Sequence, residues 1–228
     1  MPELLGLSLY NDANLQEYYK LEDLTGKNAN NLTNNGAATF VAAKFGNGVS
    51  GGASDADKSL SIANALGWNG GAYAISFWAK VNTAPSSNTY NFLELFEGTN
   101  DTSILIEYVD TAGTKSITWH RLKVGVGTQS ASFNVDLGTT NYHHIVWTYD
   151  GTTVKGYVNN VERASFAASG NGSTALATKF NIMAGRNDNT SGNFLGIIDD
   201  VALFNRNLTA AEVSTIYNDI GGIFSSDI

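Results

Sequence analysis

Apolar and polar residues alternate in short bursts along this chain, and clusters of glycine and asparagine separate the bursts. A period of two is typical of a strand with one face in a core and the other in water. Nine segments show this pattern and are predicted to be strands: 74–81, 90–96, 103–108, 116–124, 143–149, 153–158, 161–166, 180–184 and 194–204. Nine strands predict an all-β fold in which two antiparallel sheets stack as a sandwich.

The links between some of these strands are tight turns. Asp150-Gly151 and Asn159-Asn160 are residue pairs that tolerate the positive φ of a two-residue hairpin. Segment 143–166 is therefore predicted to be a three-stranded meander. The apolar residues expected in the packed faces are Ile75, Phe77, Val146, Trp147, Ile198, Val201 and Leu203.

One segment near the C-terminus departs from the strand pattern. Thr209 and Glu212 have the spacing of a capping box, and Val213, Ile216 and Tyr217 then follow at helical spacing. The sequence therefore predicts one short helix that closes the domain.

Composition favours a single domain, because 228 residues with 43% apolar content suit one large sandwich. The expected division is an N-terminal extension at 1–16, the sandwich at 17–218 and a tail at 219–228. These extensions offer a possible route to oligomers, by pairing with a neighbouring subunit or an anchor protein.

Charge and residue content exclude several classes of function. A net charge of −8 with scattered basic residues argues against a nucleic-acid partner. With no cysteine there is no disulfide, thiol nucleophile or zinc–thiolate site. No apolar stretch approaches the roughly 20 residues of a membrane span, and no signal peptide is visible at the N-terminus.

Three histidines and two strand glutamates are the candidates for catalytic groups. His143 and His144 are adjacent in a strand and point to opposite faces, so they cannot share a metal. His120 has no catalytic pattern beside it in sequence, which favours a hydrogen-bonded structural role. Glu94 and Glu107 could meet across neighbouring strands as a carboxylate pair, but each is equally explained as an outward polar position.

Oxygen-rich side chains gather at two places that together suit calcium. Glu22, Asp23, Gly26 and Asn28 lie in one N-terminal loop, and calcium prefers such loops. The pair Asp199-Asp200 interrupts an apolar strand, where a carboxylate is costly to bury without a cation or a donor. The predicted structural Ca²⁺ ligands are Asp23, Gly26, Asn28 and Asp199; the alternative is two unrelated polar spots.

A glycan would need exposed aromatic or hydroxyl-binding groups. Trp78, Trp119 and Trp147 lie within strands and are expected in the core, whereas Trp68 and Tyr90 are the candidates for an exposed aromatic platform. The loop that holds Arg186, Asn187 and Asp188 could bind sugar hydroxyls or a second cation, although its composition is also that of an ordinary turn. These five residues form the predicted ligand site: Trp68, Tyr90, Arg186, Asn187 and Asp188.

Five blocks resemble the laminin-G-like, concanavalin A-like lectin/glucanase jelly-roll family of bacterial and viral type. They are YYKLEDLTGKNANNLTNNG at 18–36, KFGNGV at 44–49, AISFWAKV at 74–81, YHHIVWTYDGTTVKGYVNNV at 142–161 and GIIDDVALFNRNLTAAEVSTIYN at 196–218. The resemblance implies a structural calcium near Asp23 and Asp199. Two departures are Tyr142, where the family usually has tryptophan, and a short N-terminal loop.

The resemblance implies a calcium-stabilised module for carbohydrate binding or adhesion, placed outside the cell or on a virion surface. Related glucanases have a Glu-x-Asp-x-x-Glu type of motif, which is absent here, so no enzymatic activity is expected. The alternative function is a structural or assembly protein of a virion or cell surface, and a glycoside hydrolase is the third reading.

Overall fold

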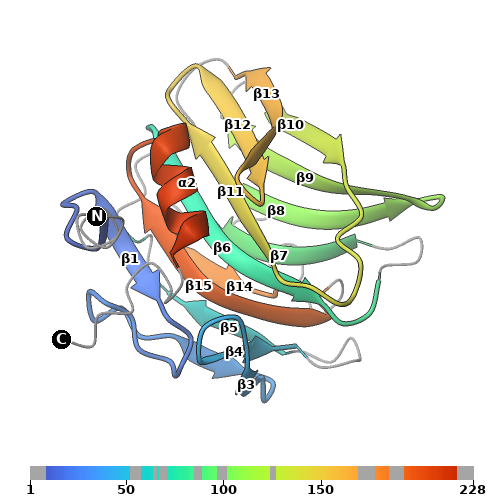
Figure 1. Ribbon diagram of the computed structural model, residues 1–228. Helices are drawn as coiled ribbons and strands as arrows, with labels where there is room; N and C mark the ends of the chain where they lie inside the picture. Colours follow the sequence, from blue (N-terminus) through green and yellow to red (C-terminus); the bar gives the residue numbers. More distant parts are fainter. Residues whose placement is uncertain are drawn as a thin grey trace.

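The computed structural model of the chain contains two antiparallel sheets and one C-terminal helix (Figure 1). It describes residues 9–51, 58–63, 66, 71–84, 89–96, 102–123, 127–168, 178–184 and 193–219. The predicted all-β sandwich is confirmed.

The first sheet has eight strands, and its long central strands are the buried ones. Along the sheet they are β13 (Val161–Ala167), β12 (Thr153–Val158), β11 (His143–Tyr149), β6 (Tyr73–Val81), β15 (Gly196–Phe204), β4 (Asn47–Ser50) and β3 (Thr39–Ala42), and β1 (Leu15–Tyr19) also pairs with β15. The predicted meander β11–β12–β13 is confirmed. Its turns have the expected positive φ at Gly151, Asn159 and Asn160.

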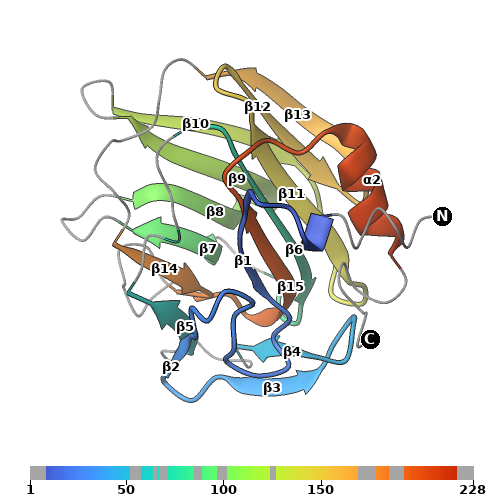
Figure 2. The same cartoon turned by 90° about the vertical axis from the view of Figure 1, so that its left-hand side faces the viewer.

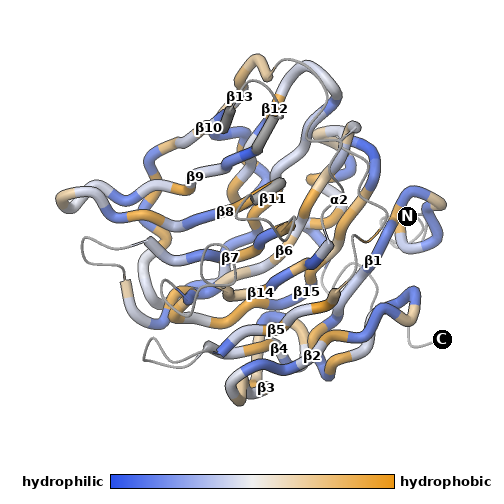
Figure 3. The backbone as a smooth tube through the Cα atoms, turned by 180° about the vertical axis from the view of Figure 1, so that it is seen from behind, coloured by the Kyte–Doolittle hydropathy of each residue, from blue (hydrophilic) through white to orange (hydrophobic). Residues whose placement is uncertain are grey.

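The second sheet has seven strands. In order they are β10 (Gly127–Asn134), β9 (Thr114–Lys123), β8 (Thr102–Thr111), β7 (Thr89–Phe96), β14 (Lys179–Ile182), β5 (Ser59–Ile62) and β2 (Thr33–Asn35). Hydrophobic and hydrophilic positions alternate along β8 and β9 (Figure 3), so each strand has one face toward the first sheet and one away from it.

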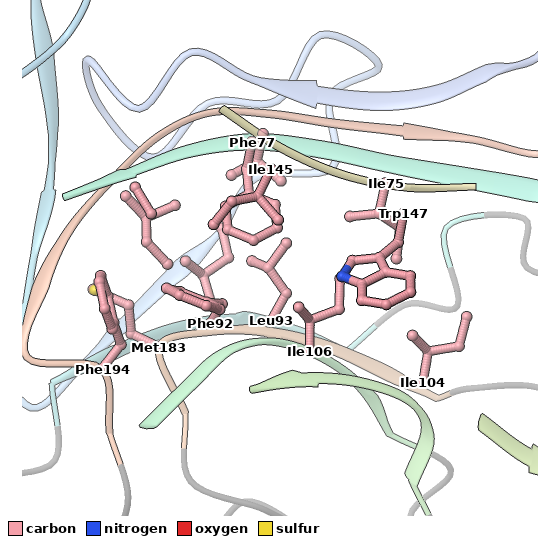
Figure 4. Packing of buried hydrophobic residues seen from close by; sticks show 14 of the residues in the cluster. Ile75, Phe77, Phe92, Leu93, Ile104, Ile106, Ile145, Trp147, Met183 and Phe194 are labelled. Atoms are coloured by element: carbon pink, nitrogen blue, oxygen red, sulfur yellow. The ribbon is translucent and has the colours of Figure 1, made fainter. Parts of the chain in front are cut away.

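The main core lies between the two sheets. Ile75, Phe77 and Trp147 point from the first sheet toward Phe92 and Ile106 of the second (Figure 4). All seven residues predicted for the packed faces are buried, as are Trp78, Trp119 and Trp147. The rings of Trp119 and Trp147 stack across the sheets with centroids 6.1 Å apart.

A smaller second core lies on the other face of the first sheet. Helix α2 (Ala210–Asn218) lies across this face beside β11 (Figure 1), and its Val213 and Ile216 pack with Val146, Phe204 and residues of the N-terminal segment. The predicted capping box at Thr209 and Glu212 is present. The helix therefore covers the first sheet, whereas the second sheet lies on the opposite side of the molecule (Figure 2).

Candidate functional site

Polar side chains gather on the face of the second sheet that points away from the core. Glu107 of β8 lies on this face, because Ile106 and Tyr108 on either side of it belong to the core. Register pairs Glu107 with Asn91 and Leu105 with Glu94 of β7. Directly paired residues share a face, so Asn91 and Glu94 point outward as well.

A β-bulge in β7 makes this arrangement possible. Residues three apart on a regular strand face opposite sides, yet Asn91 and Glu94 share one face. The register shifts between Asn91 and Leu93, and Phe92 is the extra residue, so that Phe92 and Leu93 are both in the core. The bulge therefore brings a buried amide and a buried carboxylate to the same surface.

Two short hydrogen-bonded chains connect these groups to neighbouring strands. Asn181 of β14 donates from Nδ2 to Glu94 Oε2 at 3.1 Å. Glu107 Oε2 lies 2.7 Å from His120 Nε2 of β9, and His120 Nδ1 lies 2.7 Å from Ser130 Oγ of β10. We call the five residues Glu94, Asn181, Glu107, His120 and Ser130 the polar row.

Burial changes along the polar row. Glu94, Asn181 and Glu107 are 1%, 0% and 7% exposed, whereas Ser130 is exposed and His120 is intermediate. A buried polar group is costly unless it is hydrogen-bonded, so a line of such groups on one sheet face is an unusual feature. The sequence predicts only that Glu94 and Glu107 could meet across neighbouring strands; the full row depends on a register that spans five strands.

The second polar site is at Asp199, on the opposite face of the first sheet from the main core. Its Oδ2 accepts a hydrogen bond from the Phe45 backbone N–H at 2.9 Å, and its Oδ1 is buried without a hydrogen-bond partner among the described residues. Burial, together with the nearby carboxylates of Asp200 and Glu22, raises the pKa of Asp199 to about 8. Asp200 accepts a short hydrogen bond from the Tyr18 hydroxyl.

The N-terminal loop brings the predicted calcium ligands to different partners. Asp23 is exposed, and its Oδ1 accepts from both the backbone N–H and the hydroxyl of Thr25, which lowers the pKa of Asp23. Gly26 and Asn28 instead gather around the buried Glu17: a Cβ at Gly26 would be 2.9 Å from the Glu17 carboxyl carbon, and the Asn28 N–H donates to Glu17 Oε1 at 2.8 Å.

The loop residue whose charge acts on Asp199 is Glu22. Its carboxylate accepts from the Asn47 N–H at 3.1 Å and adds to the raised pKa of Asp199. The described residues contain no group of three or more His, Cys, Asp or Glu side chains placed to hold a metal. A cation at Asp199 would therefore need several backbone carbonyl oxygens as well as carboxylates.

The predicted aromatic platform is wrong for Tyr90. This side chain is 5% exposed and belongs to the main core, because it neighbours the outward Asn91 on β7 and so points inward. The other predicted ligand residues, Trp68, Arg186, Asn187 and Asp188, lie outside the described residues.

The adjacent histidines point to opposite faces, as predicted. His143 bonds to the Leu137 carbonyl at 2.7 Å, whereas His144 is fully buried beneath α2 and lies 2.8 Å from Ser76 Oγ. Burial lowers the pKa of His144 to about 3. Both are structural groups.

A sequence profile described as the concanavalin A-like lectin/glucanases superfamily matches residues 53–214, which is more than half of the chain. The chain belongs to this superfamily. None of the curated proteins matches the chain.

Solved structures of the same lectin-like jelly roll are similar in fold. Domain 4 of AbnA, a GH43 extracellular arabinanase from Geobacillus stearothermophilus solved with arabinotriose, is 19% identical with a TM-score of 0.66, over 88% of this chain and 97% of that one. A botulinum neurotoxin type C structure, from a study of cell entry through two ganglioside molecules, is 16% identical with a TM-score of 0.72. The match covers 94% of this chain and 53% of that one.

The receptor-binding domain of a botulinum neurotoxin C/D mosaic is 15% identical with a TM-score of 0.69. The match covers 90% of this chain and 51% of that one. The chain thus spans about half the length of these toxin chains. Among the described residues, no helix is long and apolar enough to cross a membrane.

Proposed function

We propose that this chain is a non-catalytic carbohydrate-binding module and that the polar row is its glycan site. The observation that carries the proposal is the line of hydrogen-bonded carboxylate, amide, imidazole and hydroxyl groups on the second sheet, which ends at the exposed Ser130. The superfamily and the arabinanase domain that was solved with arabinotriose support it.

The row has the chemistry that sugar recognition needs. A carboxylate accepts two or more hydrogen bonds, and an amide both donates and accepts, so each can hold hydroxyl groups of a ring. The exposed Ser132 and the half-buried Thr118 flank His120 and Ser130 and extend the hydroxyl surface. The existing bonds between the groups fix their positions before a ligand arrives, which lowers the entropic cost of binding.

The arrangement favours binding over hydrolysis. A glycosidase places two carboxyl groups on either side of the scissile bond, one as an acid and one as a base or nucleophile. Here Glu94 bonds to Asn181 and Glu107 bonds to His120, so each carboxylate is already held by an adjacent side chain as an acceptor. We therefore propose a module that holds the sugar without cleaving it, and an extracellular location like that of the arabinanase.

A glycan array followed by calorimetry with the best binder tests the proposal. Glu94→Gln removes a charged acceptor from the row and should weaken binding at least 10-fold, because hydrogen bonds to charged groups contribute about 1.5–3 kcal/mol. Glu162→Gln is the matched control, since Glu162 forms an exposed ion pair with Lys155 on the first sheet. An array without any binder, or equal loss in both variants, would refute the site. Release of reducing sugar would refute the non-catalytic role.

We also propose that Ca²⁺ binds at Asp199, with Glu22 rather than Asp23 as its second carboxylate. The buried Oδ1 of Asp199, which has no hydrogen-bond partner in the described part of the chain, supports this, because a cation would neutralise a charge that burial otherwise opposes. Gly26 and Asn28 have partners around Glu17 and are left out of the proposed ligand set.

Thermal melts with Ca²⁺ or EDTA test this site. Calcium should raise the melting temperature of the native chain at pH 8, and Asp199→Asn should abolish the shift. Glu22→Gln should reduce the shift, whereas Asp23→Asn should leave it unchanged. A native chain with equal melting temperatures in Ca²⁺ and EDTA would contradict the proposal. Assembly through the terminal extensions stays a prediction, because residues 1–8 and 220–228 lie outside the described part of the chain.

A further inference from the structure

The direction of the hydrogen bonds between Glu107, His120 and Ser130 follows from their chemistry. An ionised carboxylate only accepts, so the 2.7 Å contact to Glu107 Oε2 requires the proton on His120 Nε2. In a neutral imidazole the other nitrogen then carries a lone pair. In this neutral form Ser130 Oγ, 2.7 Å from Nδ1, is the donor of that bond, whereas a protonated imidazole would donate from both nitrogens and Ser130 would accept.

This direction decides what Ser130 offers to a ligand. The hydroxyl has one hydrogen and two lone pairs, and the hydrogen is turned inward to His120. The exposed side of Ser130 thus presents only acceptor lone pairs. A hydroxyl such as that of Ser132, two residues along the same face of β10, is under no such constraint from His120.

The carboxylate at the buried end of the row is also a hydrogen-bond acceptor. Glu94 is an acceptor, and Asn181 Nδ2 is already directed at its carboxylate at 3.1 Å. Lys179, the basic residue of β14, lies on the same face two residues from Asn181, at the far end of the row from Ser130. The net charge of −8 also repels anionic ligands over longer distances.

We propose that His120 is neutral with its proton on Nε2 and that the polar row therefore selects ligands by their donors: it binds sugars that present hydroxyl or amino groups and rejects sugars that carry carboxylate or sulfate. This inference rests on the proposed function for the ligand being a glycan. Glu107 is the positioning residue, because it fixes the histidine tautomer that turns the Ser130 hydrogen inward.

The ligand class is tested with the best neutral oligosaccharide from the array and the same oligosaccharide oxidised at C6 to a carboxylate. The neutral form should bind at least 10-fold more tightly. Ser130→Ala should weaken the neutral ligand about 3- to 10-fold, the range expected for one hydrogen bond, and the control Ser132→Ala less than 2-fold. Equal affinity for the two ligands, or equal effects of the two variants, would overturn the proposal.

The role of Glu107 is tested in the isosteric variant Glu107→Gln. A neutral amide can donate or accept, so it no longer fixes the tautomer, and the discrimination between the neutral and oxidised ligands should fall at least threefold while Ser130 is still present. Unchanged discrimination would show that Glu107 does not position the site.

The hydrogen-bond direction can be measured without a ligand. Long-range ¹H–¹⁵N correlation spectra of the native chain at neutral pH should show His120 with its proton on Nε2 and a lone pair on Nδ1. A proton on Nδ1 would overturn the inference even if glycans bind. Conversely, an array without binders refutes the proposed function, and the ligand class with it, whatever tautomer the spectra show.

Discussion

His144 lies beside the stacked rings of Trp78 and Tyr217, with ring centroids 5.0 Å and 6.1 Å from theirs. It is fully buried, and burial lowers its pKa to about 3, so it stays neutral in the folded chain over most of the acidic range. A histidine in the unfolded chain takes up a proton near pH 6.5. The unfolded state therefore binds more protons between about pH 6.5 and pH 3, and stability falls as the pH falls through this window.

Replacing His144 by phenylalanine should flatten this dependence. His144→Phe keeps an aromatic ring at this place but cannot titrate. From pH 6.5 to pH 4.5 the unfolding free energy of the native chain should therefore fall by about 2 kcal/mol more than that of the variant. Urea unfolding at both pH values measures it. His143→Phe is the control, because His143 is only half-buried. Parallel pH curves for the native chain and His144→Phe would contradict the prediction.

Single residues were predicted well where alternation alone decides their face. The tryptophans of 74–81, 116–124 and 143–149 are in the core as expected. The prediction for Tyr90 was wrong, because strand alternation places Tyr90 on the inward face, next to the outward Asn91. The polar row could not be predicted, since it depends on the register of β14, β7, β8, β9 and β10 and on a bulge that leaves no clear sequence signal.

At the scale of elements, the sequence predicted the long amphipathic strands, the helix and the short strand β14, but not β1 to β5 or β10. The strands β11 and β12 begin and end where alternation places them. The strands β1 to β5 have three to five residues each, too few for a period to stand out among glycine and asparagine. In β10 only Ala131 and Phe133 are apolar inward residues, so its sequence GTQSASFN lacks the strand pattern.

The helix offers a quantitative test at this scale. Thr209 caps α2 by accepting from the Glu212 N–H, and Glu212 bonds back to the Thr209 N–H. Thr209→Ala removes the cap and should lower the unfolding free energy by about 1 kcal/mol in urea titrations. Thr215→Ala, inside the same helix, should change it by less than about 0.5 kcal/mol, because Thr215 only bonds back to Ala211. Equal losses would show that the cap is not the source of the effect.

For the whole molecule, two sheets share one continuous core. Neither sheet can bury its inner face alone, and the stacked rings of Trp119 and Trp147 join them near the middle. The sequence predicted this architecture because nine alternating strands need a partner face, but it could not order the strands, most of which pair with neighbours far away in the chain.

The shared core predicts that the sheets unfold together. Near-UV circular dichroism reports on the Trp119–Trp147 pair, and far-UV dichroism reports on the strands, so the two signals should disappear at the same urea concentration. The variant Trp119→Phe separates the tryptophan signal from other aromatic residues. If the near-UV signal disappears at a lower urea concentration than the far-UV signal, the two sheets separate before their strands unfold.

The bulge at Phe92 also limits how this chain can change its length. Deleting Phe92 alone would restore a regular strand in which Asn91 and Glu94 still point outward and Leu93 still points inward, so the polar row would keep its register. The cost would fall on packing, because the Phe92 ring lies against Phe77 and Phe194 in the core. A one-residue deletion at a regular position of β7 would instead turn the side chains on one flank of the deletion to the other face of the sheet. We therefore expect changes in length to preserve the site at the bulge or in the connecting loops, but not at the regular positions of β7.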